Sequence, residues 1–245
     1  MRFFKLEMGF NSKLTLRHEH LTMPQATGEP LKILYLSDLH YWGPVGPIAA
    51  KNTMIACMDE RPDLVLLGGD LVDGTQGLRD LSGLVKGLSC LAPVWAVGGN
   101  HDFHFGLRQV KEAVTRGGGN WLGSRSVALQ LRGNHLRLDG RRRADPLDGS
   151  YRIYCTHEPE SFPAAAAQNY DLMLAGHLHG CQFVFWQKNS ELFPGRWFFK
   201  WNGLRYRKGR TRMLVSRGAG DLIPLRWNCP REAICVNLSP TALEN

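Results

Sequence analysis

The amino-acid sequence predicts an α/β protein, because short apolar runs alternate with helical patterns and because each run ends in a cluster of glycine and polar residues. Runs of this length are typical of buried strands. Helical patterns at residues 48–60, 78–91 and 107–114 separate the first three runs. Strands that alternate with helices predict a sheet with parallel strands at its heart. The runs are residues 33–36 before SDLH, 64–67 before GGD, 94–97 before GGNHD, 153–154 before CTHE and 172–175 before GHLHG.

Other parts of the chain indicate further strands. Residues 127–138 contain short alternating runs on either side of a Gly-Asn break, which predicts a hairpin. Strand-like runs follow at 183–186, 213–216 and 234–238. We therefore expect a second sheet.

Length and composition indicate one folding unit. The chain has 245 residues, 43% of them hydrophobic, and no stretch of linker composition divides it. We expect one domain over residues 1–245, with core motifs at 31–180 and a cap-like segment at 183–217. The formal charge of +8 and the isoelectric point near 9.4 indicate an anionic substrate or partner. Charge alone does not choose between nucleic acid, membrane lipid and a phosphorylated metabolite.

Cysteine usage and hydropathy bear on the compartment. The six cysteines form no C-x-x-C pair, which favours reduced thiols in a cytosolic setting. Residues 1–16 form no continuous apolar run of signal-peptide length, and no run of about 18 apolar residues occurs. We expect a cytoplasmic protein that is at most peripheral on the inner face of a membrane.

The polar clusters supply carboxylate, amide and imidazole groups but no thiolate. Because ligands bind outside the carboxyl ends of strands in α/β sheets, the clusters should converge on one site. This donor set suits manganese, iron or zinc and is too rich in histidine for calcium. Seven donors exceed one tetrahedral shell, whereas two metal ions about 3.5–4 Å apart would use them all. The donors are Asp38, His40, Asp70, Asn100, His157, His177 and His179.

The order of these motifs resembles that of the calcineurin-like metallophosphoesterases. Five blocks of that signature are intact over about residues 31–180. The resemblance implies a β-sandwich flanked by helices, in α-β-β-α layers, with two metal ions at the strand ends. The blocks read Asp38-Leu39-His40, Gly69-Asp70-Leu71-Val72-Asp73, Gly99-Asn100-His101-Asp102, His157 and Gly176-His177-Leu178-His179.

The resemblance also implies that the donors form two sets joined by one carboxylate. Two divalent ions, with manganese favoured and iron or zinc as alternatives, would hold a bridging hydroxide as the nucleophile. The cations lower the pKa of a shared water, so hydroxide is available near neutral pH. The first set is Asp38, His40 and His179, the second is Asn100, His157 and His177, and the shared carboxylate is Asp70.

A further histidine of the motifs lies outside both sets. His101 matches the family residue that donates a proton to the leaving oxygen or stabilises its charge, and Asp73 resembles the partner that orients it. Asp102 is expected to accept bonds from backbone amides at the turn rather than to steer His101. His104 is expected to pack or to support a ligand from outside. Three histidines outside the motifs are given no role: His18, His20 and His135.

A narrower resemblance concerns the substrate. Four segments look like one bacterial subfamily that includes membrane-associated phosphoesterases proposed to release UMP and a lipid A precursor from UDP-2,3-diacylglucosamine. Position 181 is Cys where relatives have Gly, and the N-terminal membrane or export segment of relatives is missing. We expect hydrolysis of a phosphodiester or diphosphate bond, with this nucleotide-lipid as the candidate substrate. The segments are THEPE at 156–160, GHLHGCQ at 176–182, VSRGAG at 215–220 and PLRWNCPRE at 224–232.

Two alternatives stay open. A phosphomonoesterase or a nuclease would use the same core motifs. A scaffold without catalysis is disfavoured, because every ligand and His101 are present.

Residues 192–220 carry eight Arg or Lys residues and no acid. Their aromatic neighbours could contact lipid or anionic headgroups, or could pack in a strand pair with solvated cations. A nucleic-acid groove ranks below lipid, since nucleases of this superfamily usually carry additional domains. The six aromatics are Phe193, Trp197, Phe198, Phe199, Trp201 and Tyr206.

Overall fold

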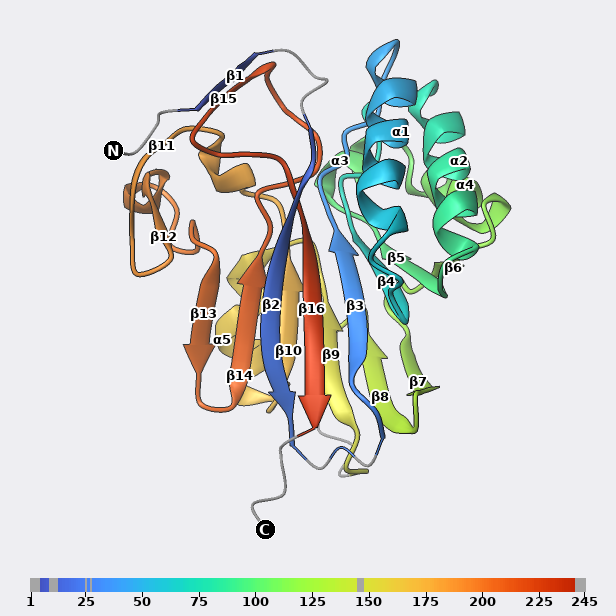
Figure 1. The fold of residues 1–245 in the computed structure, drawn as a ribbon, viewed down its shortest axis with the longest axis vertical. Coiled ribbons are helices and arrows are strands. Elements are labelled where there is room, and N and C mark those ends of the chain that lie inside the picture. Colours follow the sequence, from blue (N-terminus) through green and yellow to red (C-terminus); the bar gives the residue numbers. More distant parts are fainter. Residues whose placement is uncertain (1–4, 9–12, 25, 27, 145–147, 241–245) are drawn as a thin grey trace.

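The computed structural model describes residues 5–8, 13–24, 26, 28–144 and 148–240. Two six-stranded sheets dominate it (Figure 1). Part of the N-terminal stretch considered above, residues 1–4 and 9–12, lies outside the described residues. In the described part, no helix has the length and apolar character needed to cross a membrane.

The first sheet has the strand order β2-β16-β3-β4-β5-β6. The four strands from β3 to β6 are parallel, as the alternation of strands and helices predicts. β16 is antiparallel to β3 and parallel to β2, a strand that the sequence analysis missed. The strands are β2 (Thr15–Met23), β3 (Leu31–Leu36), β4 (Leu64–Gly68), β5 (Val94–Val97), β6 (Asn120–Trp121) and β16 (Glu232–Pro240).

The second sheet has the order β13-β14-β10-β9-β8-β7. Its four middle strands are parallel, and both edge strands are antiparallel to their neighbours. The hairpin predicted around 127–138 is confirmed as β7 and β8. The strands are β7 (Ser126–Leu131), β8 (Asn134–Asp139), β9 (Tyr151–Cys155), β10 (Leu172–Ala175), β13 (Arg205–Lys208) and β14 (Thr211–Val215).

Side chains alternate between the two faces of β3. Ile33 and Tyr35 join a core that also contains Ile153 and Leu172 of the second sheet, so the two sheets pack face to face. The intervening residues, such as Leu34, face a second core that the helices cover. Because both faces of β3 are buried, its sequence is a continuous apolar run rather than an alternating one.

Helices form the two outer layers. The helices α1, α2 and α4 cover the first sheet, and α5 packs on the second (Figure 1). The α-β-β-α layering is therefore confirmed. The helices are α1 (Val45–Met58), α2 (Gly77–Ser89), α3 (Asn100–Phe105), α4 (Leu107–Arg116) and α5 (Phe162–Ala167), with short 3-10 turns η1 (Pro159–Ser161), η2 (His179–Cys181) and η3 (Gly195–Trp197).

Two expectations need correction. The last two of the five apolar runs, β9 and β10, lie in the second sheet and not beside β3, β4 and β5. Part of the segment expected to form a cap, residues 205–215, instead supplies β13 and β14 of the second sheet. Two small ribbons lie outside both sheets: β11 (Val184–Lys188) with β12 (Glu191–Pro194), and β1 (Leu6–Met8) with β15 (Leu225–Trp227).

Candidate metal centre

The carboxyl ends of strands from both sheets meet at one edge of the sandwich. His157, which follows β9, lies with Nδ1 3.0 Å from the backbone oxygen of Gly68 at the end of β4. The backbone amide of His177, which follows β10, donates to Asp38 Oδ1 over 2.9 Å. The predicted convergence of the polar clusters is thus observed, although it takes two sheets rather than one.

Left-handed backbone conformations concentrate at this edge. A non-glycine residue with positive φ is uncommon and costs about 1 kcal/mol or more, so its recurrence at one place points to function. Gly69, with φ of 89°, extends the pattern between β4 and Asp70. Five of the seven predicted donors adopt positive φ: Asp38 at 55°, His40 at 46°, Asp70 at 52°, His177 at 77° and His179 at 51°.

The first donor group consists of Asp38, His40 and His179, all of them buried. The Nε2 atoms of His40 and His179 face each other at 3.0 Å. Asp38 Oδ1 lies 3.4 Å from His179 Nε2. Two imidazole nitrogens and one carboxylate oxygen therefore converge on one point, which is the arrangement that a divalent cation requires.

The second donor group contains Asp70, His157 and His177. Asp70 Oδ2 lies 3.0 Å from His157 Nε2, and His177 Nδ1 lies 3.2 Å from the same nitrogen. Asn100, the first residue of α3, lines a hollow together with His157. All seven predicted donors are therefore gathered at this edge.

Two of the candidate ligand histidines are also bonded through Nδ1, the ring nitrogen that does not face the other donors. His40 Nδ1 lies 2.8 Å from Asp73 Oδ2, and His157 Nδ1 donates to the Gly68 carbonyl. Metal-binding histidines commonly make such a bond, which fixes the tautomer and directs the other nitrogen at the ion. The donor chemistry and its support both fit two divalent cations.

The carboxylates and the histidines shift one another's pKa values. Burial lowers the pKa of His157, but its hydrogen bond to Asp70 and the charges of Asp38 and Asp70 raise that pKa to about 9. Burial likewise lowers the pKa of His40, and Asp73 outweighs it to give a net rise. His179 changes in the opposite direction, because burial and the neighbouring His40 and Arg226 lower its pKa well below the ordinary value. The acids make this edge attractive to cations.

His101 belongs to neither group. Its Nδ1 lies 2.8 Å from Asp73 Oδ1, so one carboxylate holds both His101 and His40. The two rings meet edge to face, with centroids 4.7 Å apart. The predicted pairing of His101 with Asp73 is therefore present.

Residues 31–181 match the family model described as calcineurin-like phosphoesterase. The chain belongs to this family. It is therefore a hydrolase that acts on phosphate esters, and the family uses divalent metal ions.

Curated relatives extend the similarity beyond the matched core. A phosphodiesterase of Escherichia coli, YaeI, is 28% identical over 91% of this chain and 87% of its own. YkoQ of Bacillus subtilis, a metallophosphoesterase without a described function, is 25% identical over 82% of each chain. A solved archaeal phosphodiesterase has a TM-score of 0.44 at 13% identity, covering 76% of this chain and 82% of that one.

Asp102 behaves as expected of a turn residue in this phosphoesterase. Its carboxylate accepts bonds from the amides of Leu71 at 2.9 Å, Val72 at 3.3 Å and Gly99 at 2.9 Å. Burial raises the pKa of this carboxyl to about 6. Asp102 thus ties the loop after Asp70 to the start of α3, while the His101 ring is bonded to Asp73.

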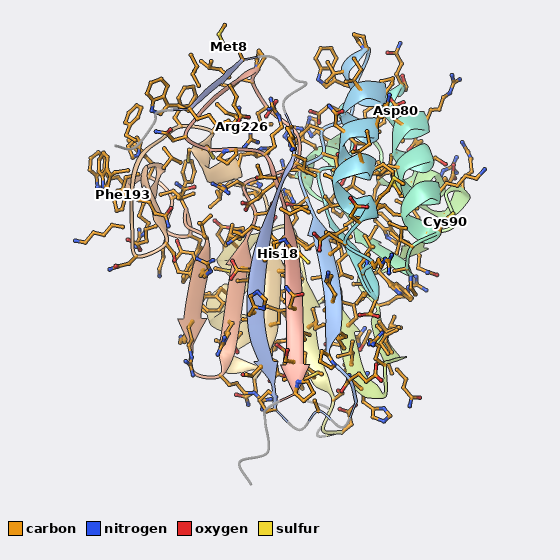
Figure 2. The ribbon with its side chains drawn as sticks, in the orientation of Figure 1. Met8, His18, Asp80, Cys90, Phe193 and Arg226 are labelled. Carbon is orange, nitrogen blue, oxygen red and sulfur yellow. The ribbon has the colours of Figure 1, made fainter. Side chains whose placement is uncertain are left out.

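His104 lies beside the predicted donors, whereas the three histidines outside the motifs do not. His104 is exposed and lines a hollow of about 580 Å³ with Asp73, Asn100, His101 and Phe105, so it does not pack in the core, and its supporting role beside a ligand stays a prediction. His18 lies on β2 (Figure 2), 3.6 Å from Glu60. His20 and His135 are exposed on strands of different sheets.

Two supporting residues were missed. Ser37 donates to Asp38 Oδ2 over 2.5 Å, and its place in SDLH was the available signal. Arg226 is fully buried, with Nη2 3.4 Å from His179 Nδ1 and Nε 2.6 Å from Asp221. Arg226, labelled in Figure 2, lies within PLRWNCPRE, a segment for which the resemblance implies no role of the arginines.

Proposed function

We propose that this phosphoesterase hydrolyses a phosphodiester or diphosphate bond at a two-metal centre. Asp38, His40 and His179 would hold one ion, and Asn100, His157 and His177 the other. Asp70 would bridge them. The observation that carries this proposal is the pair of donor groups whose imidazole and carboxylate atoms already lie about one hydrogen-bond length apart.

The bridging role of Asp70 has electrostatic support. One of its oxygens accepts the His101 amide over 2.8 Å while the other faces His157. Its charge also contributes to the raised pKa of His40, which belongs to the first group. A carboxylate that influences both groups is suited to joining them.

The two cations would supply Lewis-acid stabilisation of phosphoryl oxygens and a shared water of lowered pKa. The protein's own part would be carried by Asp73 and His101. Because Asp73 occupies His101 Nδ1, the atom left for the substrate is Nε2. His101 also lines the open hollow, where it could donate a proton to the departing oxygen.

For the substrate we propose a nucleotide-lipid, with UDP-2,3-diacylglucosamine as the specific candidate. The phosphodiesterase name of the Escherichia coli relative supports a diester or diphosphate over a monoester. The net charge of +8 suits an anionic substrate. Manganese is the first ion to test, followed by iron and zinc.

The test of the reaction class uses metal-free protein reloaded with Mn²⁺. Hydrolysis of bis(p-nitrophenyl) phosphate is compared with that of p-nitrophenyl phosphate, in the wild type and in His101→Ala. The matched control is His135→Ala, which removes an exposed histidine far from the donors. Metal-dependent cleavage of the diester that falls in His101→Ala alone supports the proposal, and preference for the monoester contradicts it.

The test of the substrate follows UMP release from UDP-2,3-diacylglucosamine with the same proteins. Release that depends on both metal and His101 supports the nucleotide-lipid. If the model diester is cleaved and this lipid is not, the reaction class stands and the substrate proposal fails. Cleavage of single-stranded DNA in place of the lipid would favour the nuclease alternative.

A further inference from the structure

The small ribbon of β11, β12 and η3 with the two residues after it, here called the cap (residues 184–199), exposes large aromatic side chains. Five are exposed, and the two most exposed are Phe198 at 77% and Trp197 at 66%. Isolated apolar residues are common on surfaces, but a contiguous cluster of rings is not. The other three rings are Phe185, Trp186 and Phe199.

Packing within the fold explains only part of the aromatic tract. Trp201 and Tyr206 pack against Phe162 of α5, with ring centroids 5.3 and 6.5 Å from it, and belong to the core beneath the second sheet. Those two rings are accounted for by ordinary core packing. Among the residues that the structure describes, the exposed rings of the cap belong to no such core cluster.

The cap is ordered by its own contacts. Trp186 stacks on Phe193 at 5.2 Å with an interplanar angle of 3°, and Trp197 meets Trp186 edge to face at 5.3 Å. Beneath them, Val184 and Leu192 join Leu204 and Cys229 in a small core. The rings near Phe193 stand at one extremity of the molecule (Figure 2). They form a fixed ridge on a supported hairpin.

The charge around this ridge is positive. Between residues 184 and 208 the only acid is Glu191, and Arg196 pairs with it over 2.7 Å. Lys188 and Lys200 of this segment form no ion pair with any residue that the structure describes, and the Lys200 ammonium lies 5.0 Å from the centroid of the Trp201 ring. The ridge therefore has a surplus of cations beside it.

We infer that the cap docks on an anionic lipid bilayer. Tryptophan side chains prefer the boundary between headgroups and acyl chains, where the apolar ring and the indole N–H are both satisfied, and phenylalanine rings beside them add apolar area that the acyl region buries. Lysines beside them can extend to anionic headgroups while their stems cover apolar surface. The exposed rings match the acyl-chain side of this boundary, and the neighbouring lysines, which pair with no acid in the part of the chain that the structure describes, match its anionic headgroups.

The position of the cap gives this docking a consequence for the metal centre. The cap packs beside η2, which begins at His179, and a Cβ added at Gly180 would lie 3.0 Å from Leu192 Cδ1. Docking would therefore place the donor edge near the lipid surface. The inference goes beyond the proposed reaction and does not depend on it.

A protein partner is the competing occupant. A protein contact would also bury the rings, but its strength would not depend on anionic lipid. It would also give no reason for lysines beside the rings that form no ion pair within the described residues. The surplus of cations therefore favours the bilayer. This difference is what the experiment measures.

The experiment is co-sedimentation of the full chain with vesicles of phosphatidylcholine alone or with one third phosphatidylglycerol. The test variant is Trp197→Ser/Phe198→Ser. The matched control is Ile55→Ser/Met58→Ser, which removes apolar side chains of 56% and 53% exposure from α1. We expect binding to anionic vesicles that weakens with salt. The cap variant should lose about tenfold in partition coefficient, and the control should match the wild type.

A second variant separates charge from apolar burial. Lys188→Glu/Lys200→Glu keeps every ring and should also bind about tenfold more weakly to anionic vesicles, because each cation contributes at the surface. Circular dichroism and hydrolysis of bis(p-nitrophenyl) phosphate check that both variants remain folded. Equal binding by wild type and cap variant, or no binding by the folded wild type, overturns the inference. A wild-type dimer that the cap substitutions dissociate would identify a protein interface instead.

Discussion

The candidate metal centre and the cap depart from the usual burial pattern in opposite directions. At the centre, Asp38, Asp70 and His179 are almost fully buried although they are polar. At the cap, Trp197 and Phe198 are exposed although they are large and apolar. Folding stability alone explains neither arrangement, since buried charges and exposed rings both cost free energy. Each is explained by something outside the chain, a cation in one case and a surface in the other.

The two regions also differ in how their side chains are fixed. The donors are held by bonds from several elements, such as those from the His101 amide to Asp70 and from Ser37 to Asp38. The exposed rings of Trp186 and Trp197 pack on each other and on Phe193 of their own hairpin. Substitutions at the centre should therefore affect chemistry and metal affinity, whereas those at the cap should leave both intact.

The largest effect is expected from Asp70→Asn. Removing the charge of the proposed bridging carboxylate should lower kcat/KM on a model diester by about a thousandfold, because several kcal/mol of charge stabilisation are lost. Asp102→Asn should cost less activity and more stability, about 2 kcal/mol, since it disturbs three backbone bonds. Steady-state kinetics measure the loss of activity in each variant, and urea unfolding measures the loss of stability. Comparable losses of activity would undermine the assigned roles.

The next largest effect concerns His101. His101→Ala should lower kcat by about a hundredfold with little change in metal content, as expected for a proton donor outside the ligand sets. Asp73→Asn should lower it by about tenfold, because its carboxylate orients both His101 and His40. Metal analysis of each purified variant is the control. A His101→Ala protein that loses its metal would instead indicate a ligand.

Metal binding should release protons. The pKa of His157 is raised to about 9 in the metal-free chain, so the ring is mostly protonated at pH 7. Ligation requires the neutral imidazole, so His157 should lose its proton, and His40, whose pKa is also raised, should add to the release. For His157 alone, affinity should rise about tenfold per pH unit below its pKa. Calorimetry in buffers of different ionisation enthalpy measures the release, and binding enthalpies that do not vary with the buffer would contradict the expectation.

The sequence was most informative where motif and burial coincide. The runs of β3, β4 and β5 are apolar because both faces are covered, and the donors follow directly, so strands and site could be predicted together. β2 was missed because its inward side carries Glu19, which Arg17 and Arg205 neutralise over 2.9 and 2.7 Å. That pairing exists only in the folded chain.

Which strands share a sheet was not predictable from local pattern. β9 and β10 have the same apolar runs and polar ends as β3 and β4, yet they form the second sheet. Register and sheet membership depend on contacts between distant residues. The same holds for Arg226, whose place beside His179 spans 47 positions in the sequence.

The smallest effect tests the cap against the core within one aromatic tract. Trp197→Ser should change the free energy of unfolding by less than about 0.5 kcal/mol, because this ring is 66% exposed and its ring partners, Trp186 and Phe193, belong to the cap itself. Trp201→Ser should cost about 2 kcal/mol, because that ring packs on Phe162 and Tyr206. Urea unfolding of the two variants compares the same Trp→Ser substitution at an exposed site and at a packed site. Equal losses would mean that the exposed rings stabilise the fold, and their exposure would then no longer point to an external surface.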